Sequence, residues 1–145
     1  ISYSVTGVQT CALPIYAMRI LSEEAELNEI VQLVGVDALS SDDRVTLEVA
    51  RSIREDYLHQ NAFHDIDTFT SLSKQYRLLK LIIMFYSKAK EAVKGGAAIE
   101  QISAMSVLEK IGRAKYTPEN EVGTVFTQIE EDLAKEAEAL IRRDA

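Results

Sequence analysis

Residues whose side chains could bind a ligand or take part in a reaction cluster between positions 59 and 67, where imidazole, carboxylate, amide and aromatic groups occur together. The metal-ligand types in this cluster are His59, His64, Asp65 and Asp67. Their spacing matches no established ligand pattern, and the chain has only 2 histidines. Helix capping by the aspartates and partial burial of the histidines explain them, so we predict no metal site. Phe63 in the same cluster could stack on a purine base, or could simply cap a hydrophobic core.

The chain lacks the residues that cleave a nucleoside triphosphate. That reaction needs phosphates held by backbone amides, a lysine, and a hydroxyl on magnesium, as in G-x-x-x-x-G-K-[ST]. The pair Gly95-Gly96 and Gly112 have neither this spacing nor a Lys-Ser/Thr ending. No G-x-S-x-G elbow marks a hydrolase triad. We therefore predict no catalytic residue in this chain and no hydrolysis of ATP by the chain alone.

Length and charge set further limits. The chain has 145 residues and a net charge of −7, which predicts one domain and repulsion from nucleic acid. The longest apolar run, Leu81–Tyr86, is far shorter than the roughly 20 residues that cross a bilayer. We expect no nucleic-acid partner and no direct membrane insertion.

Residues 1–16 differ in character from the remainder because they carry no charge. Within them, Val5–Ile15 (VTGVQTCALPI) is the translation of a widely used DNA-sequencing adapter. The alternative, a signal peptide, lacks a basic start and has an interrupted apolar run. We interpret residues 1–16 as an artefactual or disordered extension and residues 17–145 as a helical domain whose natural start is lost upstream.

The elements that must position the cluster are helices. A first helix, residues 17–34, should end at Gly35, a residue that tolerates positive φ. Ser40, with Asp43 three residues later, should cap a second helix from about Ser41. Its buried face should carry Val45, Val49, Ile53 and Tyr57. Its outer face alternates arginine with glutamate and is typical of a paired, solvated surface: Arg44, Glu48, Arg51, Arg54 and Glu55.

The rest of the chain predicts a bundle around a long third helix. That helix should run from about Thr68 to Lys94, with caps at Asp65 and Asp67, and should end at Gly95-Gly96. Its two apolar stripes are Leu72, Tyr76, Leu79, Ile83 and Tyr86, and beside them Leu78, Ile82, Phe85 and Ala89. A short helix follows near Ile99, and Thr117-Pro118 should start a last helix of about Pro118 to Arg142. The buried face of that last helix should carry Val122, Phe126, Ile129, Leu133, Ala137 and Leu140. We predict an all-α helical bundle with a protruding hairpin.

Several stretches resemble one family, the C-terminal domain of the catalytic subunit of rotary ATPases. The turn Asp37–Asp43 reads DALSSDD and is similar to the acidic hairpin tip of that family. The exit Gln60–Phe63 reads QNAF and looks like the catalytic A subunit of the archaeal and bacterial V/A-type enzymes. KQYRLLK (Lys74–Lys80) and KIGRAKY (Lys110–Tyr116) look like the same A subunit. The resemblance covers most of the chain from Ala17 onward.

This resemblance implies functions for two sites. Gln60, Ala62 and Phe63 would line one side of an adenine pocket. The hairpin tip would touch the rotating central stalk, through Asp37, Ala38, Leu39, Ser40, Ser41, Asp42 and Asp43. The tip has fewer carboxylates than is usual in the F-type pattern, so shape and a stiff helix pair would transmit the force.

The resemblance also implies a setting. The full protein would use ATP or ADP with Mg, in a ring where A and B subunits alternate, at the cytoplasmic face of a membrane. ATP hydrolysis or synthesis would be coupled to proton or sodium transport, and no bound nucleotide is expected on the fragment.

Two alternatives stay open at this stage. One is a free-standing helical interaction module whose acidic hairpin is a docking surface without a nucleotide role. The other is a regulatory or non-catalytic rotary subunit, which the QNAF exit disfavours.

Overall fold

The computed structural model describes residues 2–58 and 71–143, with side chains over 12–58 and 71–142. The helices, in order, are α1 (Ser2–Val34), α2 (Ser41–Ser52), α4 (Leu72–Lys94), α5 (Ile99–Ser103), α6 (Val107–Ala114) and α7 (Val122–Arg143). Shorter turns complete the fold: the 3₁₀ helix η1 (Val36–Ala38), the π-helix η2 (Ile53–Leu58) and the 3₁₀ helix η3 (Glu119–Glu121). The described residues contain no strand, so the all-α prediction is confirmed.

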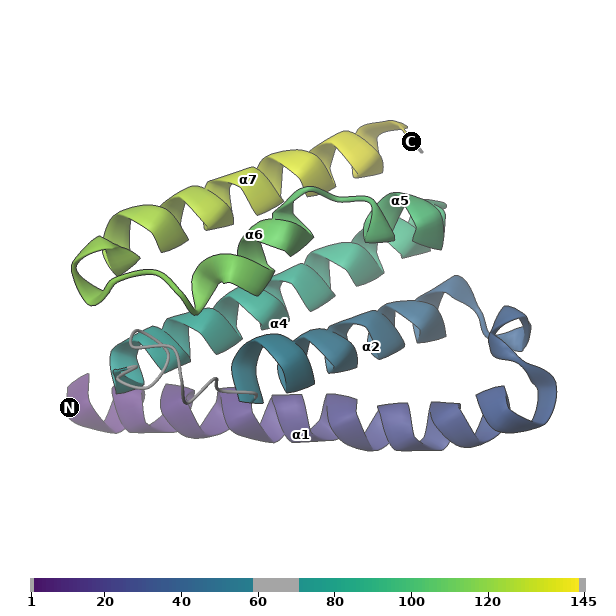
Figure 1. The fold of residues 1–145 in the computed structure, drawn as a ribbon, viewed down its shortest axis with the longest axis horizontal. Helices are drawn as coiled ribbons and strands as arrows, with labels where there is room; N and C mark the ends of the chain where they lie inside the picture. Colours follow the sequence, from purple (N-terminus) through teal and green to yellow (C-terminus); the bar gives the residue numbers. More distant parts are fainter. Residues whose placement is uncertain (1, 59–70, 144–145) are drawn as a thin grey trace.

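The helices are stacked, with α4 at the centre. Figure 1 shows α1 and α2 side by side and antiparallel, α4 packed on the other side of α2, and α7 on the far side of α4. The turn between α1 and α2 lies at one end of the stack, and the N-terminus lies at the other (Figure 1). The uncharged extension that we predicted over residues 1–16 is helical here from Ser2 onward, and its origin stays a prediction.

Apolar side chains at helical spacing explain the stacking. On α4 the stripe Leu78, Ile82, Phe85 and Ala89 is almost fully buried. It meets Val45, Val49 and Ile53 from α2 and η2, which are equally buried, as predicted. The predicted face of α7 is also in the core, with Leu140 at its edge: Val122, Phe126, Ile129, Leu133 and Ala137. Burying a side chain of this size contributes about 1.5–3 kcal/mol each, so this layer dominates the stability.

The prediction for the start of α4 was wrong. The helix begins at Leu72, with Ser71 as its N-cap, rather than near Thr68. The Ser71 hydroxyl accepts a hydrogen bond from the Lys74 amide at 3.1 Å. The predicted caps Asp65 and Asp67 lie outside the described residues. Because the helix starts here, Leu72 falls in its first turn and is 82% exposed, although we predicted it on a buried stripe.

One other boundary also differs from prediction. Pro118 has an extended conformation and precedes η3, so α7 proper begins at Val122. Within the described residues, none of the helices has an apolar run long enough to cross a bilayer.

The turn at Gly35 requires glycine because of its backbone conformation and not because a larger side chain would clash with a neighbour. Gly35 has φ 90 and ψ 161, and a Cβ placed there would meet no atom within 4 Å. We expect Gly35→Val to destabilise the 145-residue chain by about 1–3 kcal/mol, because a branched residue is strained in that conformation. Gly123→Ala, at a helical position that is equally open, should instead stabilise by about 0.5–1 kcal/mol. Thermal unfolding followed by circular dichroism measures both; equal stability of Gly35→Val and the parent would contradict the assignment.

Candidate functional site

The hairpin tip is a hydrogen-bonded turn. The Gly35 amide donates to the Val31 carbonyl at 2.8 Å and closes α1, and η1 follows directly. Ser40 then caps α2, and its hydroxyl accepts from the Asp43 amide at 3.1 Å, as predicted. Leu39 is the apolar anchor of the turn and is 9% exposed. The other predicted contact residues of the tip are exposed or half-buried, so Leu39 alone among the seven is turned inward.

A lysine of α4 holds the tip against the bundle. The Lys90 ammonium donates to the Asp42 carbonyl at 2.8 Å, to the Asp42 carboxylate at 2.7 Å and to the Thr46 hydroxyl at 2.9 Å. These bonds join the first turn of α2 to the C-terminal part of α4. The tip is therefore tied to that end of α4, and the Asp42 carboxylate is already paired.

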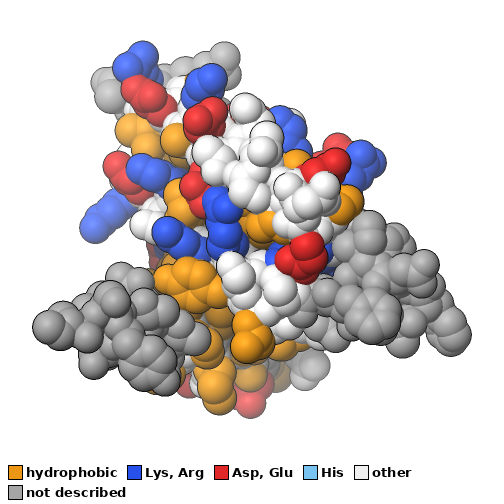
Figure 2. All heavy atoms as spheres, turned by 90° about the vertical axis from the view of Figure 1, so that its left-hand side faces the viewer, with side chains coloured by type: hydrophobic (Ala, Val, Ile, Leu, Met, Phe, Trp, Pro, Cys, Tyr) orange, Lys and Arg blue, Asp and Glu red, His pale blue; other side chains and the backbone are white. Residues whose placement is uncertain are grey.

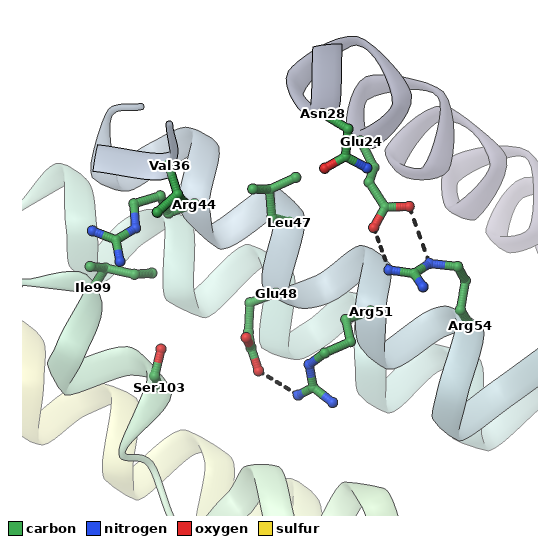
Figure 3. Close-up of a pocket in the computed structure, with 10 residues that line it drawn as sticks. All are labelled: Glu24, Asn28, Val36, Arg44, Leu47, Glu48, Arg51, Arg54, Ile99 and Ser103. Carbon is green, nitrogen blue, oxygen red and sulfur yellow. Dashed lines mark hydrogen bonds and ion pairs between the residues drawn. The ribbon is translucent and has the colours of Figure 1, made fainter. Parts of the chain in front are cut away.

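The outer face of α2 is paired as predicted only in part. Arg51 lies between Glu48 at 2.5 Å and Glu55 at 2.8 Å, and its hydrogen bond to Glu48 is the main reason that its pKa is raised. Arg54 pairs instead with Glu24 of α1, at 2.5 Å. Figure 3 shows the Arg54–Glu24 pair bridging the two helices of the hairpin. This bridge fixes α1 on α2, which the pattern of α2 alone did not predict.

The predicted nucleotide segment lies between two described flanks. Gln60, Ala62 and Phe63 fall outside the described residues, as do His59 and His64 of the histidine cluster. Asp65 and Asp67 are outside them too. The described residues contain no cluster of His, Cys, Asp and Glu suited to a metal ion. The chain enters the segment from η2, which ends at Leu58, and leaves it at Ser71.

Both flanks are held by one connection, the residues 115–119 between α6 and α7, which we call the strap. On the entry side, the Lys115 ammonium donates to the Glu55 carbonyl at 3.1 Å. On the exit side, the Ser71 amide and hydroxyl donate to the Glu119 carboxylate at 2.9 and 2.8 Å. These hydrogen bonds hold the pKa of Glu119 below its usual value.

Lys74 joins α4 to the same strap. Its side chain is completely buried, and its ammonium donates to the carbonyls of Lys115 at 2.6 Å and Thr117 at 2.7 Å. A buried ammonium is costly unless its donors are satisfied, and the carbonyl end of a helix such as α6 also favours a cation. Lys74 and Lys115 lie in the KQYRLLK and KIGRAKY stretches, but nothing in their spacing predicted that the two would meet.

Asp56 completes the entry flank. Its carboxylate accepts a hydrogen bond from the Ser52 hydroxyl at 2.7 Å. Burial raises the pKa of Asp56, against the lowering effects of that hydroxyl and of Arg51 and Lys115 nearby. The entry flank thus carries a partly desolvated carboxyl group one turn before the nucleotide segment.

An apolar hollow lies at this end of the molecule. A pocket of about 140 Å³ is lined by Leu13 and Pro14 of α1, Tyr57 of η2, and Leu72 and Tyr76 of α4. Figure 2 looks onto this end and shows hydrophobic side chains gathered low in the view, with Lys and Arg side chains above them. The pocket is apolar and carries none of the groups that would bind a triphosphate.

Comparison with known proteins agrees with this geometry. The family described as the C-terminal domain of V and A type ATP synthase matches residues 12–103. The chain belongs to this family. The "V-type ATP synthase alpha chain" of Acetivibrio thermocellus is 62% identical over 127 residues, which are 88% of this chain and 22% of that protein.

Two further relatives carry the same printed name. The protein of Thermoanaerobacter pseudethanolicus is 56% identical over 129 residues, and that of Clostridioides difficile is 54% identical over 127 residues. These matches cover 89% and 88% of this chain and 22% of each relative. The chain spans about a fifth of the length of the V-type alpha chains that it matches. The family predicted from the DALSSDD and QNAF stretches is therefore confirmed.

Lys74 offers a direct test of the strap in this V/A-type C-terminal domain. Lys74→Met keeps the apolar stem and removes the ammonium, which deprives two carbonyls of their donor. We expect a loss of about 2–4 kcal/mol in the free energy of unfolding, because unmet buried acceptors cost about 1–3 kcal/mol each. Lys80→Met, at an exposed position on the same helix, is the matched control and should change stability by less than about 0.5 kcal/mol. Chemical denaturation measures both variants, and equal losses would refute a special role for Lys74.

Glu119 predicts an acid-dependent contribution to stability. Its folded-state pKa is lowered, so its contribution is fully present above the ordinary value of 4.5 and is lost as the pH falls through the folded value. Glu119→Gln should therefore be less stable than the parent at pH 7, with the difference narrowing below about pH 4.5. Denaturation of both proteins between pH 3 and 7 measures this difference. Glu121→Gln, two residues on and also exposed, controls for the loss of one negative charge. A difference that does not depend on pH would rule out the Ser71–Glu119 bond as its source.

Proposed function

We propose that the chain is the C-terminal part of the catalytic A subunit of a V/A-type rotary ATPase. In this proposal the complete subunit hydrolyses or makes ATP with Mg and couples the reaction to proton or sodium transport. It stands in a ring with B subunits and other A subunits, around a central stalk, at the cytoplasmic face of the membrane. Family membership and the alpha-chain names of the relatives support this assignment.

The domain's own contribution is to sense the nucleotide and to move a lever. One observation carries this step: the segment of Gln60, Ala62 and Phe63 is continuous with both α2 and α4, and both of its flanks are tied to the strap. We propose that this segment forms one wall of the adenine pocket. The phosphate loop and the catalytic carboxylate belong upstream, so the 145-residue chain alone is predicted to be inactive.

Nucleotide moves the hairpin only if it binds two hairpin positions with different affinity. A contact in the segment can meet this condition because α2 and η2 connect the tip to the segment without a break in the chain. Asp37, Ala38 and the residues up to Asp43 then press on the central stalk. The tip has the rigidity for this role, since Gly35, the Ser40 cap and Lys90 fix its shape.

The decisive experiment replaces the aromatic ring in the complete subunit, assembled with its partners. Phe63→Ala should raise the KM for ATP about tenfold with a smaller change in kcat, because stacking of a base on an aromatic ring contributes about 1–3 kcal/mol. Phe63→Tyr keeps the ring and should stay within about twofold of the parent. Steady-state ATP hydrolysis measures both. An unchanged KM for ATP in Phe63→Ala would contradict the proposal that this segment forms a wall of the adenine pocket.

A further inference from the structure

The outer side of the hairpin carries an arginine, Arg44, that no described carboxylate neutralises. Arg44 lies in the N-terminal part of α2 and is half-buried. Glu48, one turn on, is already paired with Arg51, and Glu24 is paired with Arg54. Among the residues that the structure describes, the Arg44 guanidinium makes no ion pair or hydrogen bond. A cation this close to a helix N-terminus is also disfavoured by the helix dipole, so α2 itself gains nothing from it.

Arg44 lines a groove of about 350 Å³ between α1, α2 and α5, which we call the Arg44 groove. Figure 3 shows the Arg44 side chain beside Val36 and Ile99, while Glu48 and Arg51 point toward each other farther along α2. Leu47 and Ser103 also line the groove. The lining is mainly polar, with Val36, Leu47 and Ile99 as its apolar residues, and it presents one guanidinium that is available to a ligand.

The charges of the groove select the kind of ligand. Of the three guanidinium groups that line the groove, that of Arg51 is paired with Glu48 and with Glu55, and that of Arg54 is paired with Glu24. Among the described residues, the Arg44 guanidinium is the one of these three without a carboxylate partner. A single carboxylate would neutralise it, and its two oxygens fit the planar fork of a guanidinium. A phosphate with two charges would exceed the charge of the one unpaired guanidinium and would lie beside the carboxylates of Glu24 and Glu48.

We propose that the Arg44 groove is a docking site for an acidic side chain, flanked by apolar residues, on a protein partner. The groove is continuous with the hairpin tip, because Val36 belongs to η1 and Arg44 follows the tip by one residue. Resting on the function proposed above, the partner is the central stalk that the tip contacts. The contact then has two parts, the tip, which acts through its shape, and the Arg44 groove, which holds a carboxylate.

Arg44→Ala in the complete subunit, assembled with its ring partners, tests this docking site. We expect the affinity of the ring for the stalk to fall about tenfold at low salt, because truncating an arginine at a packed contact costs more than about 1 kcal/mol of binding free energy. The parent's affinity should fall with added salt more steeply than that of Arg44→Ala. Arg113→Ala is the matched control, because Arg113 is an exposed arginine on α6 paired with Glu109, and it should bind as the parent does. An unchanged affinity in Arg44→Ala, with an unchanged melting temperature, overturns the proposal.

A photo-crosslinking amino acid at position 44, and separately at position 38, separates this inference from the proposed function. Cross-links from both positions to the stalk, with an acidic residue near the site reached from position 44, support the docking site. A cross-link to the stalk from position 38 alone agrees with the proposed lever but overturns the proposal that the Arg44 groove is a docking site. A cross-link from position 44 to another member of the ring also overturns it, and loss of both stalk cross-links counts against the lever as well. Mass spectrometry of the linked peptides reads each outcome.

Discussion

The buried ammonium of Lys74 is the interaction on which the arrangement of this domain depends. A charged group without access to water is tolerated only when its donors have partners, and here two carbonyls of the strap accept hydrogen bonds from the ammonium. Because these carbonyls lie at the end of α6, the lysine fixes α4 on the α6–α7 connection at one point. The Lys115 ammonium and the Glu119 carboxylate then reach from that connection to the two flanks of the nucleotide segment. Any displacement of one flank therefore acts on the other through the strap.

The sequence predicted those parts of the fold that depend on local rules. Gly35 ends α1 because positive φ suits glycine, and Ser40 caps α2 because a short hydroxyl can reach the Asp43 amide. Helical spacing also placed Val45, Phe85 and Leu133 in the core correctly. Each of these features is decided within a few residues of the chain. The family resemblance was correct for a related reason, since it rested on contiguous stretches such as QNAF.

The predictions were wrong where residues far apart in the sequence determine the local structure. Ser71 caps α4 rather than Asp65 or Asp67, and its own amide and hydroxyl are satisfied by Glu119, 48 residues away. Lys74 was not recognised as a core residue, because a lysine is ordinarily exposed and its partners lie more than 40 residues further along. The pairing of Arg54 with Glu24 is also a contact between residues far apart in the sequence, which local patterns do not predict. The roles of the tip and of Gln60–Phe63 depend on partners outside this chain, so they remain predictions here.

The two lysines of α4 suggest how the domain transmits a displacement. Lys74 ties the start of α4 to the strap, and Lys90, sixteen residues later and about 24 Å along the helix axis, ties its end to Asp42. Helix α2 and then η2 run in the opposite direction, from the tip to the segment. The nucleotide segment thus joins two packed helices at one end, while Lys90 joins them at the other. In the lever proposed above, nucleotide would pull on the segment, so the pair would be loaded at one end and held together at the tip, and would rotate as one body instead of splaying. A lever built from one helix would bend more easily under the same load, so the Lys90 contact at the tip fits that proposal.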